Sequence, residues 1–234
     1  MINMDEEKMG WGQRFWGVIV SPLNTFRAIG EDPRILWPAL IVIVLYSLTV
    51  LVILPETKEY TREMLSNNPA LTPEMVETSL KTVAISGIVG ALLVLPLIWL
   101  VQATVLLIIN QFMIGQARFK QLYAVSIYAW TPVLIGNAVK SALIKNMGFK
   151  AITSIRTSLA LFLSPDIKTG YLFNALNSVD LFAVWGLILL SLGGAAVMNK
   201  DSKKVALYIF GLWIIYTAVK VVLATKYVPA AGWQ

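Results

Sequence analysis

The sequence predicts an all-α fold: a polytopic helical membrane bundle with five transmembrane helices, preceded by an N-terminal amphipathic interfacial segment. Of its 234 residues, 57% are hydrophobic and only 14% are charged, whereas soluble domains carry about 25% charged residues. Five apolar runs lie at about 35–54, 83–109, 123–144, 178–198 and 205–224. Roughly 20 helical residues cross the ~30 Å hydrocarbon layer, and barrel strands are shorter than these runs. We therefore expect an interfacial segment over 1–30 and a membrane domain over 31–234.

The N-terminal segment combines aromatic and basic side chains, and its apolar residues recur at helical spacing. Ser21-Pro22 has the form of an N-cap followed by proline at the first helical position, which predicts two short helices. An interfacial helix places rings at headgroup depth and arginine toward phosphate. The expected lipid contacts are Trp11, Arg14, Phe15, Trp16 and Arg27. The alternative is a cover packed on the cytoplasmic end of the bundle.

Capping signals delimit the first two apolar runs. Asp32-Pro33 opens the first run and Leu54-Pro55 closes it. An acidic loop follows over 55–82, and within it Thr72-Pro73 predicts a helix start that continues into the second run. Pro96, near the middle of that run, predicts a kink.

The later connections differ in length. A tight loop over 115–120 precedes the third run, which Pro132 interrupts. The longest connection, 145–177, contains a stretch over 151–163 in which apolar and polar residues alternate. That stretch is too short to span a bilayer and fits an interfacial or re-entrant helix.

The distribution of basic residues predicts the orientation of the chain. The two sides carry similar totals, but on the side of the N-terminus the basic residues are concentrated in short loops. These loops contain Arg118, Lys120, Lys200, Lys203 and Lys204. Because basic residues in short loops favour the cytoplasmic side, we expect a cytoplasmic N-terminus and an external C-terminus.

Most residue types that carry enzymatic chemistry are missing. The sequence has no cysteine and no histidine, which removes the usual zinc, haem, iron–sulfur and thiol chemistry and histidine as a general base. We therefore expect no enzyme, no catalytic residue, no metal and no cofactor. The formal charge of +6 fits phospholipid headgroups and topology rather than nucleic acid, because the basic residues flank the spans.

Three ionisable residues fall within the predicted spans, where a charge at mid-depth costs roughly 2.5–3.5 kcal/mol. They are Lys140, Asp180 and Lys220. All three fall near the outer ends of their spans, so Asp180 is able to pair with either lysine. Three interpretations stay open: snorkelling and helix-end capping, a structural ion pair, or a transport site.

Polar and small residues in the spans form two further sets. The polar set either lines a permeation path or supplies hydrogen bonds between helices; it comprises Gln102, Asn110, Gln111, Tyr128, Thr131 and Asn137. The small residues permit close helix contact; they are Gly87, Gly90, Ala91 and the four residues 193–196.

Six motifs follow one another along the chain: SPLNTFRAI at 21–29, DP at 32–33, GQARFK at 115–120, YAWTP at 128–132, DLFAVW at 180–185 and LILLSLG at 187–193. Taken in this order, they resemble the Yip family of membrane proteins (Ypt-interacting, also YIPF) in its bacterial and archaeal form. The resemblance implies a five-span bundle in a prokaryotic cell membrane, with a cytosolic N-terminus and no established catalytic residues. It also implies non-enzymatic adaptor roles: eukaryotic relatives contact small GTPases in vesicle traffic, and some prokaryotic relatives accompany export-type ABC transporters. This chain lacks the Asp-Leu-Tyr-Gly-Pro stretch of eukaryotic members, which argues against a small GTPase partner.

The favoured function is that of an adaptor or accessory subunit for other membrane proteins, such as an ABC-type exporter, or a role in membrane trafficking or organisation. Its contact surface would be the small-residue helix faces and the segment 11–30. The alternative is a small solute or ion transporter or channel, with a polar site near the outer ends of spans three to five. A weaker hypothesis is a lipid-organising protein. Expected partners are the lipid bilayer, other membrane proteins and a second copy of the chain.

Overall fold

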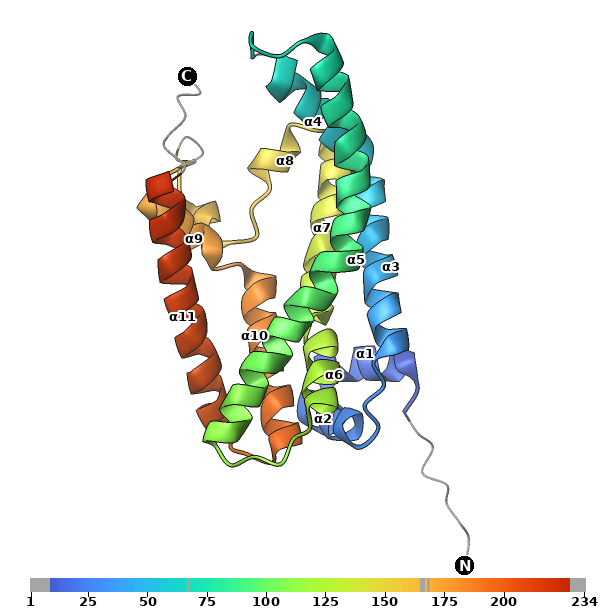
Figure 1. The fold of residues 1–234 in the computed structure, drawn as a ribbon, viewed down its shortest axis with the longest axis vertical. Helices are drawn as coiled ribbons and strands as arrows, with labels where there is room; N and C mark the ends of the chain where they lie inside the picture. Colours follow the sequence, from blue (N-terminus) through green and yellow to red (C-terminus); the bar gives the residue numbers. More distant parts are fainter. Residues whose placement is uncertain (1–8, 67, 165–166, 168, 228–234) are drawn as a thin grey trace, which may run out of the picture.

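The computed structural model is an elongated helical bundle (Figure 1) that describes residues 9–227 except 67, 165, 166 and 168. Residues 1–8 of the expected interfacial segment lie outside the described part. The helical elements of the bundle are α1 (Trp11–Val20), α2 (Pro22–Glu31), α3 (Leu36–Val52), α4 (Leu54–Ser66), α5 (Pro73–Phe112), α6 (Phe119–Ala129), α7 (Thr131–Met147), α8 (Ala151–Ser154), the 3₁₀ turn η1 (Leu159–Phe162), α9 (Tyr171–Ser178), α10 (Leu181–Met198) and α11 (Ser202–Tyr227). Within the described residues, the fold contains helices and no named strand.

Five helical segments run alternately up and down the long axis: α3, α5, the pair α6 and α7, α10 and α11 (Figure 1). Four of them, with α6 and α7 taken together, are long and apolar enough to cross a membrane, and α3 makes a fifth when it is joined to α4 across a 53° bend. The prediction of a helical membrane bundle is confirmed. We call the end that holds α1, α2 and the loop 199–201 the cover end, and the opposite end the far end.

Prolines shape three of these segments. The first span ends at the bend that Leu54-Pro55 predicts, although the loop after it contains α4, a helix that the sequence did not predict. Thr72 caps α5 by accepting a hydrogen bond from the Met75 amide at 3.3 Å, as expected. Pro96 lies inside α5, which stays one helix and curves along its length (Figure 1). The predicted interruption at Pro132 is confirmed, because α6 ends and α7 begins around Trp130.

The structure of the stretch 151–163 differs from the helix that the sequence predicts. It is not one interfacial or re-entrant helix: α8 and η1 each cover four residues, and extended backbone separates them. The Leu181 amide donates to the Thr157 carbonyl at 3.0 Å, and the Leu159 amide donates to the Val179 carbonyl at 3.0 Å. These bonds form an isolated antiparallel bridge to the start of α10. Pairing with a segment distant in sequence therefore replaces the local helical bonds.

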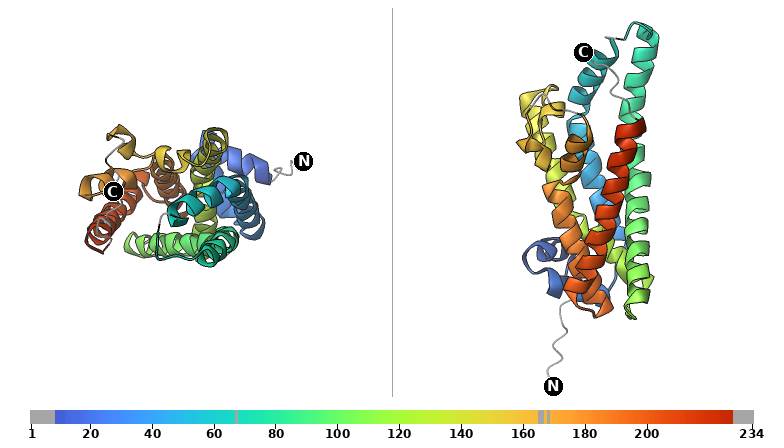
Figure 2. Two further views of the ribbon diagram at one scale, coloured as in Figure 1. Left: turned by 90° about the horizontal axis from the view of Figure 1, so that it is seen from above. Right: turned by 90° about the vertical axis from the view of Figure 1, so that its left-hand side faces the viewer.

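The main core lies toward the cover end, between α2, α5, α6 and α10. Its fully buried side chains include Phe26, Leu106, Leu122, Tyr128 and Met198. A second cluster joins α3, α5 and α6 around Trp99. The view along the bundle shows α11 at its edge (Figure 2).

Glycines of α10 allow the close helix packing that the small-residue pattern predicts. A Cβ added at Gly193 would lie 2.6 Å from the Val125 side chain and 2.9 Å from that of Phe26, and one at Gly194 would lie 2.8 Å from Leu106. The small-residue face of α10 is therefore used inside the bundle. It is not a surface for a partner, which corrects part of the contact surface expected from the sequence.

Candidate functional site

At the far end, Lys140 of α7 and Asp180 at the start of α10 form an ion pair. The Lys140 Nζ lies 3.1 Å from Asp180 Oδ2, and both side chains are half-buried. Sequence reasoning allowed a pair with either lysine, and the structure brings Lys140 to the carboxylate. The pair fixes α7 against α10.

Asp180 has little acceptor capacity left for a ligand. Its Oδ1 accepts the Phe182 and Ala183 amides at 3.0 and 3.2 Å, which caps α10. Its Oδ2 accepts from Lys140 and from the Thr157 hydroxyl. Each oxygen thus receives two donors, which saturates the usual lone-pair sites of a carboxylate. Asp180 serves as helix cap and ion-pair partner together, and we call Lys140, Thr157 and Asp180 the far-end lock.

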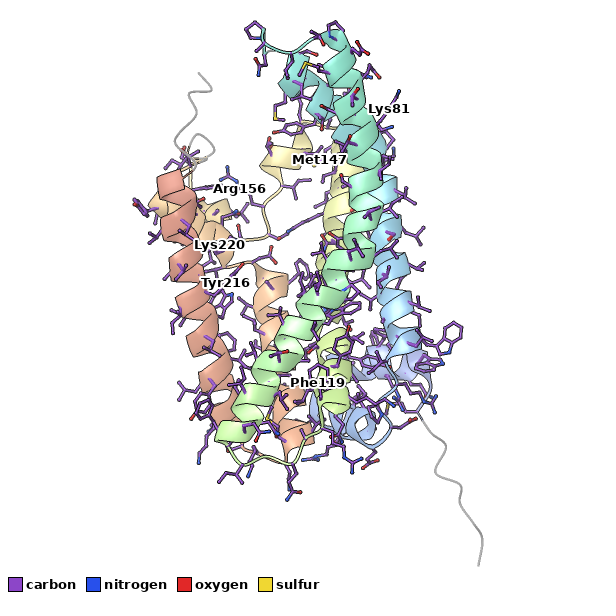
Figure 3. The ribbon with its side chains drawn as sticks, viewed as in Figure 1. Lys81, Phe119, Met147, Arg156, Tyr216 and Lys220 are labelled. Atoms are coloured by element: carbon purple, nitrogen blue, oxygen red, sulfur yellow. The ribbon has the colours of Figure 1, made fainter. Side chains whose placement is uncertain are left out.

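Lys220 lies apart from this lock. It is exposed on α11, near the labelled Tyr216 (Figure 3). Among the described residues, no ion pair joins Lys220 to Asp180. Of the three expected members of the charged cluster, Lys140 and Asp180 therefore lie together, whereas Lys220 lies on the exposed face of α11.

At the cover end, Arg14 is buried, with 2% of its side chain exposed. Its Nε donates to the Met9 carbonyl at 3.1 Å, its Nη1 to the Asp32 carbonyl at 2.8 Å and its Nη2 to Asp32 Oδ2 at 3.2 Å. Arg14 was expected to contact lipid phosphate, and the structure instead places it inside the fold. It joins α1 to the turn between α2 and α3.

The other four expected lipid contacts are distributed over both faces of the cover. Trp16 is 68% exposed and Arg27 is exposed, so these two can reach lipid. Phe15 is half-buried, with its ring 4.8 Å from that of Tyr128. Trp11 is half-buried, and the Arg34 guanidinium lies 5.0 Å from the centre of its ring. The segment thus packs as a cover on the bundle while it keeps an outward aromatic and basic face.

Asp32 does not cap the first span as expected, because α3 begins at Leu36 with Ile35 as its N-cap residue and Asp32 lies at the end of α2. Its carboxylate has another role. Its Oδ2 accepts from Arg34 Nε at 2.6 Å as well as from Arg14. The Gln121 side chain of α6 also donates to the Gly30 carbonyl at 2.8 Å. The ion pair of Asp32 with Arg34 could have been predicted, because the two residues are close in sequence. The contacts of Arg14 and Gln121 could not, because they join residues 18 and 91 positions apart.

Part of the polar set of spans two and three is engaged in local hydrogen bonds. The Asn110 amide exchanges two hydrogen bonds of 3.2 Å with the backbone of Ala117, which closes the loop before α6. Thr131 and Asn137 donate to carbonyls of their own helical segment. Gln102 has a buried Oε1 without a hydrogen-bond partner in the described part of the chain. Asn110, Thr131 and Asn137, three of the six residues, therefore stabilise local structure.

Two helices leave long apolar faces uncovered. In the apolar stretch that makes each helix long enough to cross a membrane, only 17% of α11 and 28% of α5 are buried. A Cβ added at Gly211 of α11 or at Gly90 of α5 would meet nothing within 4 Å. These faces contact lipid or another protein. In the part of the chain that the structure describes, no group of three or more His, Cys, Asp or Glu residues could hold a metal ion.

Comparison with known proteins identifies a family and a relative that each cover most of the chain. The Yip1 domain matches residues 16–223. A curated relative, "Membrane protein YknW" of Bacillus subtilis (strain 168), is 23% identical over 213 residues, which cover 86% of this chain and 87% of the relative. No solved structure matches significantly.

Proposed function

This chain belongs to the Yip1 domain family of membrane proteins, and from that premise we propose that it is a non-enzymatic adaptor for other membrane proteins. The partner class that the family resemblance favours is an export-type ABC transporter. The proposal rests on the contrast between the fully engaged carboxylate of Asp180 and an open apolar face on α11.

The open face of α11 is centred on Gly211. Along this face lie large exposed side chains, among them Leu207 at 74% and Ile215 at 62%. A glycine between large apolar residues lets a second helix approach closely, because helix association in lipid depends on van der Waals packing. Since α11 lies at the edge of the bundle (Figure 2), a partner helix can reach it without rearranging the other spans.

The far-end lock supports an adaptor over the alternative of a transporter. A transported solute needs polar groups that can exchange their partners, whereas both oxygens of Asp180 are engaged in holding α7, α10 and the loop 155–158 together. The structure therefore favours the structural interpretation of Lys140 and Asp180. Purified protein in liposomes is expected to show no solute or ion flux, and flux that Asp180→Asn weakens would favour the transporter.

We further propose that the cover end faces the cytoplasm of a prokaryotic cell. Arg118 and Lys200 lie in the short connections at that end, and Lys120, Lys203 and Lys204 lie in the first turns of α6 and α11 beside them. Basic residues at short connections favour the cytoplasmic side. Trp16 and Arg27 then face the inner headgroups, where an amphipathic segment is stable.

The test is purification from native membranes in mild detergent. We expect a stoichiometric membrane-protein partner with the unmodified chain and its loss with Gly211→Leu, which fills the open face without a clash at the Cβ position. Gly90→Leu, at an equally open position on α5, is the matched control and should retain the partner. Recovery of the unmodified chain alone, or equal loss in both variants, would count against α11 as the docking helix.

A further inference from the structure

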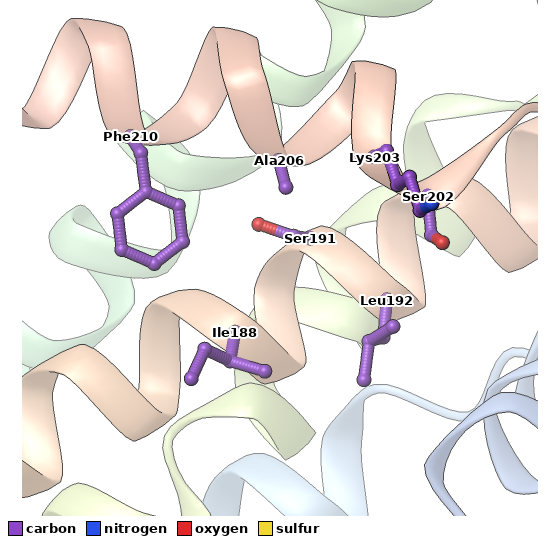
Figure 4. A pocket seen from close by; sticks show the side chains of 7 residues that line it. All are labelled: Ile188, Ser191, Leu192, Ser202, Lys203, Ala206 and Phe210. Carbon is purple, nitrogen blue, oxygen red and sulfur yellow. The ribbon is translucent and has the colours of Figure 1, made fainter.

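A small groove lies between α10 and α11 at the cover end, separate from the far-end lock and from the α11 face around Gly211. It has a volume of about 160 Å³ and is lined by Ile188, Ser191, Leu192, Ser202, Lys203, Ala206 and Phe210 (Figure 4). Pockets for small molecules usually measure roughly 300–1,000 Å³. The groove therefore suits a slender segment of a longer molecule rather than a compact ligand.

The wall of the groove is apolar for most of its length. Ile188 and Leu192 of α10 line the groove together with Ala206 and Phe210 of α11 (Figure 4). The one hydroxyl on the α10 wall, that of Ser191, is buried and donates to the Leu187 carbonyl at 2.8 Å, so its proton is not directed to an occupant. This surface matches a hydrocarbon chain.

The mouth of the groove carries positive charge. Ser202 and the exposed Lys203 lie there, in the first turn of α11, and Lys200 and Lys204 are close in sequence. Asp201 supplies one opposing carboxylate, which caps the helix through the Lys204 amide at 3.1 Å. Among the described residues, no ion pair includes Lys203. The mouth therefore attracts an anion at the level where the helices leave the membrane.

We propose that this groove binds one anionic phospholipid from the leaflet at the cover end, with an acyl chain between Ile188 and Phe210 and the headgroup phosphate beside Lys203. Charge complementarity selects this occupant, because apolar walls alone accept any lipid whereas a lysine at the mouth prefers a net negative headgroup. The flexible stem of Lys203 lies along the apolar wall while its ammonium reaches the headgroup. This site goes beyond the adaptor role and does not depend on any partner protein.

The test uses the full chain in detergent, titrated with phosphatidylglycerol or phosphatidylcholine of identical acyl chains and followed by native mass spectrometry. We expect one tightly retained phosphatidylglycerol and weaker phosphatidylcholine. Lys203→Gln should lower the phosphatidylglycerol affinity about fivefold, and Lys120→Gln, which removes an exposed charge at the same end but outside the groove, should leave it unchanged.

A second variant tests the groove itself. Ala206→Phe places a ring in the groove and keeps every charge, so it should abolish retention of the tight lipid while the helical circular dichroism stays native. Glycerol phosphate, which has the headgroup charge without acyl chains, should not compete. The proposal is overturned if the two lipids bind alike, if Lys120→Gln weakens binding as much as Lys203→Gln, or if folded Ala206→Phe protein retains the lipid. Those results would mean bulk lipid or a partner protein at this surface.

Discussion

Lys140 and Asp180 lie 40 residues apart in sequence, and their charged atoms meet at 3.1 Å where α7, α10 and the 155–158 segment converge. The same carboxylate caps α10. One side chain therefore fixes the far ends of two spans and the loop between them.

Asp180→Asn separates the two roles of this carboxylate. Asparagine remains a good helix cap but loses the charge, so we expect a loss of about 1 kcal/mol, the usual value for a half-exposed pair. Asp180→Ala also removes the cap and should cost about 1 kcal/mol more. Thermal unfolding in detergent measures both, and the exposed Lys220→Gln is the control that should not shift the midpoint. Equal midpoints for the Asn and Ala variants would contradict the capping role.

Gly193→Leu tests the close packing of α10. Its new side chain would meet Val125 and Phe26, which a Cβ alone already approaches to 2.6 and 2.9 Å. Overpacking of this kind usually costs about 1–3 kcal/mol, and we expect a lower unfolding midpoint and a lower monodisperse yield. Gly211→Ala, in open space, should instead be neutral or stabilising by up to about 1 kcal/mol, because alanine favours helix. A native midpoint for Gly193→Leu would show that the interface is looser than described.

Arg14→Gln tests how the cover is held. Glutamine cannot reproduce the three donors that Arg14 directs to Met9 and Asp32, and truncating a buried hydrogen-bonded group costs about 1–3 kcal/mol. We expect faster hydrogen exchange over 11–31 with the transmembrane core unchanged. Arg27→Gln, which changes an exposed arginine on the same cover, should keep native protection. Unchanged exchange in Arg14→Gln would mean that apolar packing alone holds the cover.

Glu56 of α4 should make the far end sensitive to acid. A hydrogen bond from Lys145 Nζ, at 2.8 Å, holds the pKa of this carboxyl below its ordinary value of 4.5. A depressed folded-state pKa contributes stability that is present above the unfolded value and lost as pH falls through the folded one. The midpoint difference between the natural chain and Glu56→Gln should therefore be constant near neutral pH and shrink below about pH 4. A difference that persists in strong acid would rule out this linkage.

The sequence predicts the spans well because bilayer thickness sets their length, and prolines at 55, 73 and 132 mark where helices bend, begin or break. Contacts between distant segments escape such reasoning. A short helix was expected over 151–163, yet Asp180 and its neighbours pair with Thr157 and Ser158 and replace the helix. Arg14 was expected at the surface, and contacts with the Asp32 turn, 18 positions away, help to hold it inside the fold.

Opposite membrane sides for the cover end and the far end follow if the first span, α3, crosses the bilayer between them. The chain contains no cysteine, so single cysteines introduced at the exposed Gly12 and at the exposed Ser66 can be labelled with an impermeant maleimide on sealed, right-side-out cells. We expect labelling at Ser66→Cys from outside and at Gly12→Cys only after the membrane is opened. Labelling of both positions from the same side would contradict the five-span arrangement on which the adaptor proposal depends.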